Sequence, residues 1–315
     1  MYILGFDIGG TKCAVNTASW DGEKITLLKK DRCPTDLSVT PEEMIERLIK
    51  MAEGILDKRP DAIGISCGGP LDSESGVILG PPNLPGWDRV EISRIISSHF
   101  GVPTQLENDA NACAVAEWRF GAGRGCRNMV FLTFGTGLGA GLILDGKLYR
   151  GTNGNAGEVG HVRLAKDGPV GFGKAGSFEG FASGGGIGRL AWSYAIAAKE
   201  RGVTPLYFKD GMTEGDVSAR SVAEAAYAGD ETAIEVYRAS AKYLGRGLSI
   251  IADILNPEAI VIGSVYARSR DLFENVMWQE LRREALSVSV DVMKVVPAEL
   301  GENIGDYASV AAAIS

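Results

Sequence analysis

The sequence lacks the features that mark several common classes of protein. Five cysteines are scattered through 315 residues without any C-x-x-C motif, so we expect reduced, structural cysteines and no disulfide framework. Thirty-two basic residues against 40 acidic ones leave a net charge of −8, which argues against a nucleic acid as the main partner. The motif G-x-x-x-x-G-K-[ST] is also absent, which excludes a P-loop nucleotide site.

A membrane-spanning segment is missing as well. The longest uncharged run, residues 128–144, contains four glycines and is shorter than the ~20 apolar residues that cross a bilayer. The first residues carry no basic stretch and reach a carboxylate at Asp7, unlike a secretory signal peptide. We therefore expect a cytoplasmic protein without a membrane partner.

The residue in excess is glycine. It accounts for 42 of the 315 residues, and 21 of these lie between Gly121 and Gly188. No three-residue period runs through that stretch, which excludes a collagen-like chain. Because 45% of the residues are apolar, the chain can bury a core, and the glycines belong to a globular protein.

Apolar runs and helical patterns alternate along the chain, which predicts an α/β fold. Strands are expected at 2–6, 13–19, 62–67, 102–107, 129–134, 140–144, 259–263 and 291–298. One helix is expected to begin at residue 41, and another to follow Asn108-Asp109 and end at residue 120. Further helices are expected at 183–200, 220–228, 230–255, 269–285 and 305–314. The first helix has Thr40 as its N-cap, Pro41 at its first position and Glu43 three residues after the cap.

Two glycine loops stand in similar contexts. The segments Asp7-Ile-Gly-Gly-Thr-Lys12 and Gly135-Thr-Gly-Leu-Gly139 each follow an apolar strand, and each leads into a second strand that ends at an Asp-Gly turn. This weak internal repeat indicates two related halves. We call Gly9-Gly10-Thr11 the first glycine loop and Gly135-Thr136-Gly137 the second.

Such loops are suited to bind phosphate, because glycine lets backbone N–H groups approach an anion without a Cβ in the way. The groups expected to contribute are Gly9, Gly10, Thr11, Lys12, Gly135, Thr136 and Gly137. Asp7 could hold Mg²⁺ through water, since Mg²⁺ prefers oxygen ligands and keeps much of its hydration. Either loop alone could also be a tight hairpin bend. The segment 135–140 matches the dinucleotide motif G-x-G-x-x-A, but that motif should open a helix, and here a strand follows.

With both loops in place, the chain resembles the ROK family of bacterial sugar kinases. The resemblance implies a two-domain actin/hexokinase-like (ribonuclease H-like) fold with a central cleft. Further family motifs occur in order: Gly68-Gly-Pro70, Pro82-Asn-Leu-Pro-Gly-Trp87, Asn108-Asp-Ala-Asn111, Gly157-Glu-Val-Gly-His161, Glu179 and Ser183-Gly184. The family also includes repressors with an N-terminal helix-turn-helix domain, for which a strand beginning at Tyr2 leaves no room.

The resemblance implies roles for individual residues. Asp109 would be the general base that takes the proton of a sugar hydroxyl, although an isolated Asp at this place could simply cap a helix. The sugar would be bound by Gly68, Gly69, Asn83, Asn108, Asp109, Glu158, His161 and Glu179. Gly263 would contact ATP. The spacing E-x-x-H at 158–161 could also mark a di-metal pair on a helix, but the surrounding glycines argue against a helix there.

The sequence departs from the family at two places. Most members hold a structural zinc in the pattern C-x-C-G-x-x-G-C-x-E, where this chain has Val170, Phe172 and Ser177 at the cysteine positions. Zinc needs thiolate or imidazole ligands and His161 cannot hold it alone, so we expect no zinc and a loop held by packing of Val170 and Phe172. The second departure is Ser264, which follows Gly263 where the family usually has a second glycine.

The sequence thus predicts a hexose kinase that uses ATP and Mg²⁺, with glucose at O6 as the expected substrate. N-acetylmannosamine, N-acetylglucosamine and fructose are the alternatives, and a non-catalytic sugar-binding sensor is a separate one. We expect one domain from residues 1–118 and 305–315 and a second from 119–304. The family resemblance also implies a homodimer.

Overall fold

The computed structural model describes residues 1–314, which form two compact units. Unit 1 contains residues 1–125 and 141–156 and the chain from Glu299 onward. Unit 2 contains residues 126–140 and 157–298. Residues 141–156 belong to unit 1, whereas the predicted division assigns them to the second domain. Gly141 explains the difference, because its Cα lies so close to the backbone of Ala110 that a Cβ would not fit.

Unit 1 is built on a five-stranded sheet in the order β3-β2-β1-β4-β8. The first three strands are antiparallel, and β4 and β8 run parallel to β1. The strands are β1 (Tyr2–Ile8), β2 (Lys12–Trp20), β3 (Ile25–Pro34), β4 (Ala62–Cys67) and β8 (Thr104–Asn108), with a small sheet of β5 (Leu71–Asp72), β6 (Val77–Leu79) and β7 (Asp88–Val90). The helices are α1 (Pro41–Ile55), α2 (Ile92–Phe100), α3 (Asp109–Phe120) and α11 (Ile304–Ala312), and a 3₁₀ turn, Gly301–Asn303, precedes α11.

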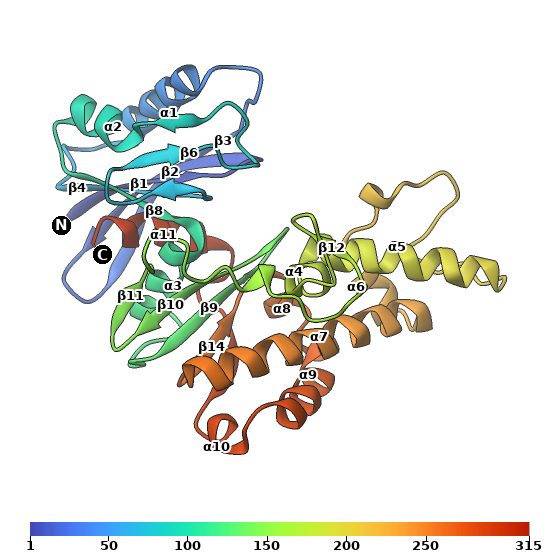
Figure 1. Ribbon diagram of the computed structural model, residues 1–315. Helices are drawn as coiled ribbons and strands as arrows, with labels where there is room; N and C mark the ends of the chain where they lie inside the picture. The colour runs from blue at the N-terminus through green and yellow to red at the C-terminus, as the bar shows by residue number, and fades with distance from the viewer. Residues whose placement is uncertain (315) are drawn as a thin grey trace. The chain divides into compact units, whose positions relative to one another are not determined.

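Helices cover both faces of this sheet (Figure 1). Leu4 and Phe6 of β1 face α1 and α2, where they join a core that includes Leu48 and Ile96. Ile3, on the opposite face of β1, packs with Val310 of α11. Alternate residues of one strand therefore enter two different cores, as the period of two in a β-strand requires.

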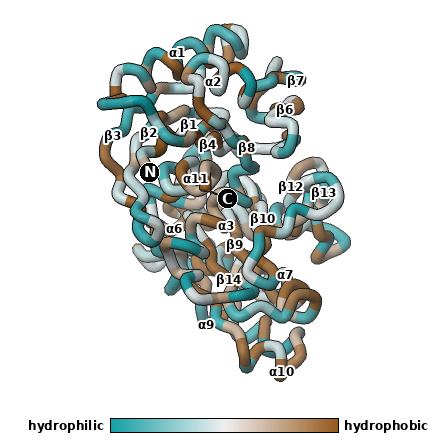
Figure 2. The backbone as a smooth tube through the Cα atoms, turned by 90° about the vertical axis from the view of Figure 1, so that its left-hand side faces the viewer, coloured by the Kyte–Doolittle hydropathy of each residue, from teal (hydrophilic) through white to brown (hydrophobic). Residues whose placement is uncertain are grey.

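Unit 2 contains β9, β14 and β15 of a second sheet, whose order is β11-β10-β9-β14-β15. The strands are β9 (Met129–Phe134), β10 (Leu138–Leu144), β11 (Lys147–Tyr149), β14 (Ala259–Ile262) and β15 (Lys294–Pro297), with a short hairpin of β12 (Val170–Gly171) and β13 (Lys174–Ala175). The tube in Figure 2 is hydrophobic along β9 and β14, and both strands are largely buried.

The ring of Phe273 lies in the core of unit 2, 5.4 Å from that of Phe134 and 5.1 Å from that of Tyr237. The helices of unit 2 are α4 (Phe178–Phe181), α5 (Gly184–Glu200), α6 (Ala219–Tyr227), α7 (Glu231–Leu255), α8 (Ser264–Arg268), α9 (Arg270–Glu284) and α10 (Ser287–Val290), with 3₁₀ turns at Val159–His161 and Glu214–Asp216. In residues 1–314, no helix is long and apolar enough to span a bilayer.

The two five-stranded sheets share one topology. In each sheet, the first strand (β1 or β9) has the next two strands of the chain on one side, β2 and β3 or β10 and β11. On its other side lie two strands that run parallel to it, β4 and β8 or β14 and β15. The internal repeat predicted from the two glycine loops therefore corresponds to a repeated strand order. The expected elements are confirmed within a few residues, including the capping box of Thr40 and Glu43. The strand expected at 291–298 begins only at Lys294, because α10 ends at Val290 and a turn follows it.

A buried carboxylate holds the chain where it first leaves unit 1 and where it finally re-enters it. Glu117 of α3 is fully buried, and its carboxylate accepts hydrogen bonds from the backbone N–H groups of Ala122 (2.8 Å), Glu299 (3.2 Å) and Leu300 (2.9 Å). Charge-assisted hydrogen bonds of this kind are stronger than neutral ones.

Replacing Glu117 by Ala should lower the free energy of unfolding by about 3 kcal/mol or more, because each buried donor left without a partner costs about 1–3 kcal/mol. Chemical denaturation measures this loss. Glu117→Gln keeps one acceptor oxygen and should lose less. The exposed Glu224, paired with Arg220, is the control, and its change to Ala should cost less than ~1 kcal/mol. Equal losses for the Ala variants at 117 and 224 would contradict the structural role.

Candidate active site

The first glycine loop joins β1 to β2. Its turn is closed by the N–H of Gly9, which donates to the carbonyl of Lys12 at 3.1 Å, and the Thr35 hydroxyl donates to the carbonyl of Gly9 at 2.5 Å. Gly10 lies against Asn83, because a Cβ at Gly10 would stand 2.5 Å from the Asn83 carbonyl oxygen. The segment containing Asn83 therefore packs on this loop. Thr11 and Lys12 are exposed, so both side chains are free to reach a ligand.

The carboxyl of Asp7, near the end of β1, is surrounded by protein and lies among the charges of two aspartates and two lysines. Burial raises the pKa of its carboxyl to about 6, with further upward contributions from the charges of Asp306 and Asp109. Asp306 is itself buried and accepts a hydrogen bond from Lys30 at 2.7 Å. The first turn of α11 closes over Asp7, and Gly305 has no room for a side chain there. Such a site favours a bound cation or a proton.

Asp109 is the first residue of α3, directly after β8. Its Oδ1 accepts a hydrogen bond from the N–H of Ala110 at 2.8 Å. The side chain is open to solvent, yet enough protein surrounds it that desolvation raises its pKa. The helix cap is the preceding Asn108, whose Oδ1 accepts from the N–H groups of Ala110 (3.0 Å) and Asn111 (3.3 Å). The alternative that Asp109 caps the helix is therefore wrong.

The segment Gly68-Gly69-Pro70 completes this group at the carboxyl end of β4. A Cβ at Gly68 would lie 3.8 Å from Oδ2 of Asp109 and 3.6 Å from Nδ2 of Asn83, and one at Gly69 would lie 3.2 Å from Nδ2 of Asn108. The Gly69–Pro70 peptide is cis. The structure thus brings together the predicted residues of unit 1, because β4 and β8 are parallel neighbours whose carboxyl ends meet.

Glu107 and Arg150 also belong to this region, and the sequence analysis did not identify them. Oε2 of the buried Glu107 accepts from Nε (2.9 Å) and Nη2 (2.6 Å) of Arg150. Oε1 of Glu107 accepts from the N–H of Asn108 at 3.0 Å and from Nδ2 of Asn111 at 3.2 Å. One carboxylate therefore fixes the residue before Asp109 and the first turn of α3.

In unit 2, the second glycine loop joins β9 to β10 and packs on the start of α5. The N–H of Gly184 donates to the carbonyl of Gly135 at 2.7 Å, and that of Gly185 donates to the carbonyl of Thr136 at 3.1 Å. These bonds hold the loop while Thr136 itself stays exposed. Because a strand and not a helix follows the loop, the dinucleotide motif is not realised.

Gly263 and Ser264 lie beside the same loop. The N–H of Gly263 donates to the carbonyl of Leu132 at 3.0 Å. Ser264 has a φ of 49°, a left-handed conformation in which glycine is favoured, and its Oγ would lie 3.9 Å from a Cβ at Gly135. The residue that departs from the family pattern thus keeps a backbone conformation typical of glycine.

Glu158, His161 and Glu179 gather near the second glycine loop. Glu179, in α4, accepts a hydrogen bond at Oε2 from the N–H of Leu138 at 3.1 Å. Glu158 precedes a 3₁₀ turn that contains His161, so the pair does not lie on an α-helix as a di-metal motif would require. A Cβ at Gly160, in that turn, would lie 3.3 Å from Cβ of Glu179, so the two segments pack closely.

The residues at the family's zinc positions do not fit a zinc ion. Among residues 1–314, no three His, Cys, Asp or Glu side chains gather as metal ligands would. Ser177 is buried and its Oγ accepts from the N–H of Gly180 at 3.1 Å, which caps α4. The expectation that Val170 and Phe172 hold the loop by packing is wrong, because both are exposed. Both belong to the short hairpin of β12 and β13, Val170 in its first strand and Phe172 in the connection.

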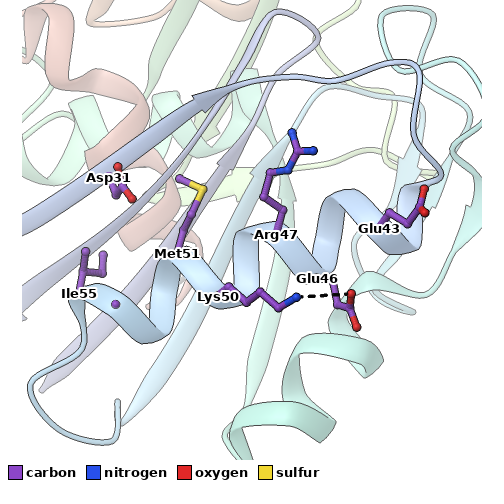
Figure 3. A pocket seen from close by; sticks show the side chains of 8 residues that line it. Asp31, Glu43, Glu46, Arg47, Lys50, Met51 and Ile55 are labelled. Carbon is purple, nitrogen blue, oxygen red and sulfur yellow. Dashed lines mark ion pairs between the residues drawn. The ribbon is translucent and has the colours of Figure 1, made fainter.

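The hollow drawn in Figure 3 lies elsewhere, along α1 and the neighbouring β3 of unit 1. It encloses about 620 Å³ and is lined mainly by charged side chains of α1, among which Lys50 and Glu46 form an ion pair at 3.8 Å. It contains none of the predicted site residues. An open hollow with alternating charges resembles an ordinary solvated helix face, so we assign it no role.

Comparisons with known proteins identify the family of the chain. The ROK family profile matches residues 3–313. A glucokinase of Streptomyces coelicolor is 33% identical over 305 residues, which cover 96% of this chain and 94% of that one. A putative xylose repressor of Caldicellulosiruptor is 30% identical over 288 residues, covering 89% of this chain and 69% of that one.

Among solved structures, a ROK family glucokinase from Streptomyces griseus, in complex with glucose and AMPPNP, has a TM-score of 0.80 and 32% identity. The match covers all of this chain and 98% of that one. It confirms the α/β, actin/hexokinase-like fold expected from the sequence. On the extent of these matches, the chain belongs to the ROK family.

Proposed function

We propose that this protein is a sugar kinase that transfers the γ-phosphoryl group of ATP to the 6-hydroxyl of glucose. The glucokinases of Streptomyces support this proposal by their similarity over almost the whole chain. The observation that carries it is the position of Asp109, an open carboxylate at the end of β8 beside Gly68, Asn83 and Asn108.

Asp109 suits the role of general base. Its raised pKa makes it a stronger base than an ordinary aspartate. It would take the proton of the hydroxyl while that oxygen forms a bond to the γ-phosphorus and the bond from phosphorus to the β-phosphate oxygen breaks, which releases ADP. Phosphoryl transfer needs mainly positioning and neutralised charge, so one such base is sufficient.

The remaining roles are divided between the units. In unit 1, Gly68, Gly69, Asn83 and Asn108 would bind the sugar, and the first glycine loop with Lys12 would bind phosphate. In unit 2, Glu158, His161 and Glu179 would bind sugar hydroxyls, and the second glycine loop with Gly263 would bind the nucleotide. Mg²⁺ held at Asp7 through water would neutralise phosphate charge, and the raised pKa of the Asp7 carboxyl beside Asp306 and Asp109 supports a cation there.

A sugar-binding sensor is the second candidate, because a putative xylose repressor is also 30% identical. A coupled assay of ADP release separates the two. The purified protein with ATP and Mg²⁺ is offered glucose, N-acetylmannosamine, N-acetylglucosamine, fructose and xylose, and sugar binding is measured in parallel by calorimetry. Turnover greatest with glucose supports the proposal, whereas binding of a sugar without any ADP release supports the sensor.

A further inference from the structure

The segment that carries zinc ligands in most ROK proteins is here a small β-hairpin. Val170 pairs with Ala175 and Gly171 with Lys174, and only Phe172 and Gly173 connect the two strands. Both connecting residues have positive φ, 42° and 74°. Positive φ at both connecting residues is what a type I′ turn requires, the connection that best matches the twist of a two-stranded hairpin.

The hairpin is fastened to its surroundings by backbone hydrogen bonds. The N–H of Gly176 donates to the carbonyl of Pro169 at 3.1 Å across its base. Beyond it, residues 162–164 pair with 176–178, as in the bond from the N–H of Phe178 to the carbonyl of Val162 at 2.8 Å. Nη1 of Arg163 donates to the carbonyl of Ala175 at 2.9 Å. These bonds order the segment without a metal ligand.

Phe172 is an unusual residue for the tip of this turn. Asn or Gly favour a left-handed backbone there, whereas a bulky side chain is a strained exception. Its side chain is also 71% exposed, so burial of the ring does not repay the strain. Strained residues of this kind cluster at functional sites, and what the ring contacts therefore matters.

The ring of Phe172 contacts His161. Their centroids are 5.7 Å apart and the rings meet edge to face at 66°. The same hairpin makes a second contact with this residue, because Nζ of Lys174 donates to the backbone carbonyl of His161 at 2.8 Å. One contact restrains the imidazole and the other restrains the backbone that carries it.

We propose that this metal-free hairpin positions His161 for the sugar, with Phe172 and Lys174 as its positioning residues. The inference rests on the proposed role of His161 in sugar binding. The hairpin would do by an aromatic contact and a hydrogen bond what ligation of a metal does elsewhere, namely restrict the orientations of a ligand-binding imidazole before the sugar arrives.

The test uses the two opposite effects of Phe172→Asn. Asparagine suits a left-handed turn position, so the melting temperature should stay equal or rise. The imidazole of His161 would lose its neighbour, and the KM for sugar should rise about 3- to 10-fold with kcat within about twofold, because ordering a free side chain on binding costs roughly that factor. Phe172→Tyr keeps a ring and should retain the wild-type KM.

A spectroscopic measurement tests the contact without turnover. The chain has only two histidines, His99 and His161, so the ring ¹H–¹³C signals of the full protein are easily assigned with a His99→Gln variant. The signals of His161 should shift in Phe172→Asn and to a smaller extent in Lys174→Met. His99, whose ring lies 4.7 Å from that of Phe100, is the internal reference and should not move.

Each outcome decides between the hypotheses. Unmoved His161 signals in Phe172→Asn, or equal KM values for the Asn and Tyr variants, would overturn the inference. Loss of the wild-type His161 signals on dialysis against a chelator would overturn it too, because a metal would then order the segment. Absence of turnover with any sugar would contradict the proposed function instead, while the His161 signals would still test the hairpin. Ile254→Ala, which removes another exposed apolar side chain, is the control and should leave both measurements unchanged.

Discussion

Asp109→Asn should reduce kcat by about 10²- to 10⁴-fold while the affinity for sugar stays within a few-fold of wild type. An amide cannot accept the hydroxyl proton, and positioned general bases contribute about this factor. The fold should survive, because the cap of α3 is Asn108 and the asparagine oxygen at position 109 can still accept from the N–H of Ala110. Coupled ADP release measures kcat, and calorimetry with the sugar alone measures binding.

The pH dependence gives a second readout of the same residue. The base must be ionised in the free enzyme, and desolvation raises its pKa. The kcat/KM of the wild type should therefore fall as the pH drops through a value above that of an ordinary aspartate. Asn108→Ala is the informative comparison, because it removes the cap and a proposed sugar contact but leaves the proposed base, so it should raise KM more than it lowers kcat. A kcat for Asp109→Asn near that of wild type would refute the assignment of the base.

The sequence predicted those segments of the candidate site that are encoded by contiguous motifs. The glycine loops, Asp109 with its neighbour Asn108, and the pair Gly68-Gly69 each lie within a few residues of a strand end, and the parallel arrangement of β4 and β8 brings two of these segments together. Their mutual proximity follows from the α/β order, which periodicity alone predicts.

The supporting residues were not predictable in the same way, because their partners are distant in the chain. Arg150 lies 43 residues from Glu107, and Leu300 lies 183 from Glu117. A lone Glu or Arg in a sequence has no visible partner, and each of these reads as an ordinary surface charge until the chain is folded. The signal that could have pointed to Glu107 is its place within a strand that leads directly into Asn108-Asp109.

The segment 162–177 shows a different limit. The missing cysteines are visible in the sequence, but what replaces them is not. Phe172-Gly173 is a poor match to the Asn-Gly and Asp-Gly pairs that predict a two-residue hairpin, whereas Asp145-Gly146, which connects β10 and β11, is a good one. The sequence led us to expect that Phe172 packs into the loop, and only the structure shows its exposure, its positive φ and its contact with His161.

Asp7→Asn should make the protein more stable and nearly inactive. The pKa of Asp7 rises from 3.8 to about 6 on folding, because the folded chain surrounds the carboxyl with protein and with the charges of Asp306 and Asp109. Ionised Asp7 therefore opposes folding. A rise of this size corresponds to about 2–3 kcal/mol, which the asparagine variant should gain at neutral pH.

The sign of the effect fixes its pH window. Below pH ~4, Asp7 is protonated in the folded and the unfolded chain, and the variant should gain nothing. Between pH 4 and 6 Asp7 is protonated in the folded chain but ionised in the unfolded one, so the free energy of unfolding of the wild type falls as the pH rises. Above pH ~6 the wild type has lost the full ~2–3 kcal/mol relative to the variant. Denaturation with urea at pH 4.5, 6 and 7.5 should thus show a difference that grows with pH. Asp31→Asn, an exposed change in the same unit, should differ from wild type by less than ~0.5 kcal/mol at every pH.

The loss of activity and the gain in stability have one cause. A carboxylate that costs free energy in the empty protein is suited to the proposed binding of Mg²⁺, since a bound cation would lower its pKa again. In Asp7→Asn the KM for MgATP should therefore rise at least tenfold, and added Mg²⁺ should no longer stabilise the protein at pH 7.5. If Asp7→Asn lost activity and showed the wild-type stability at every pH, the negative charge at position 7 would not be the origin of both effects.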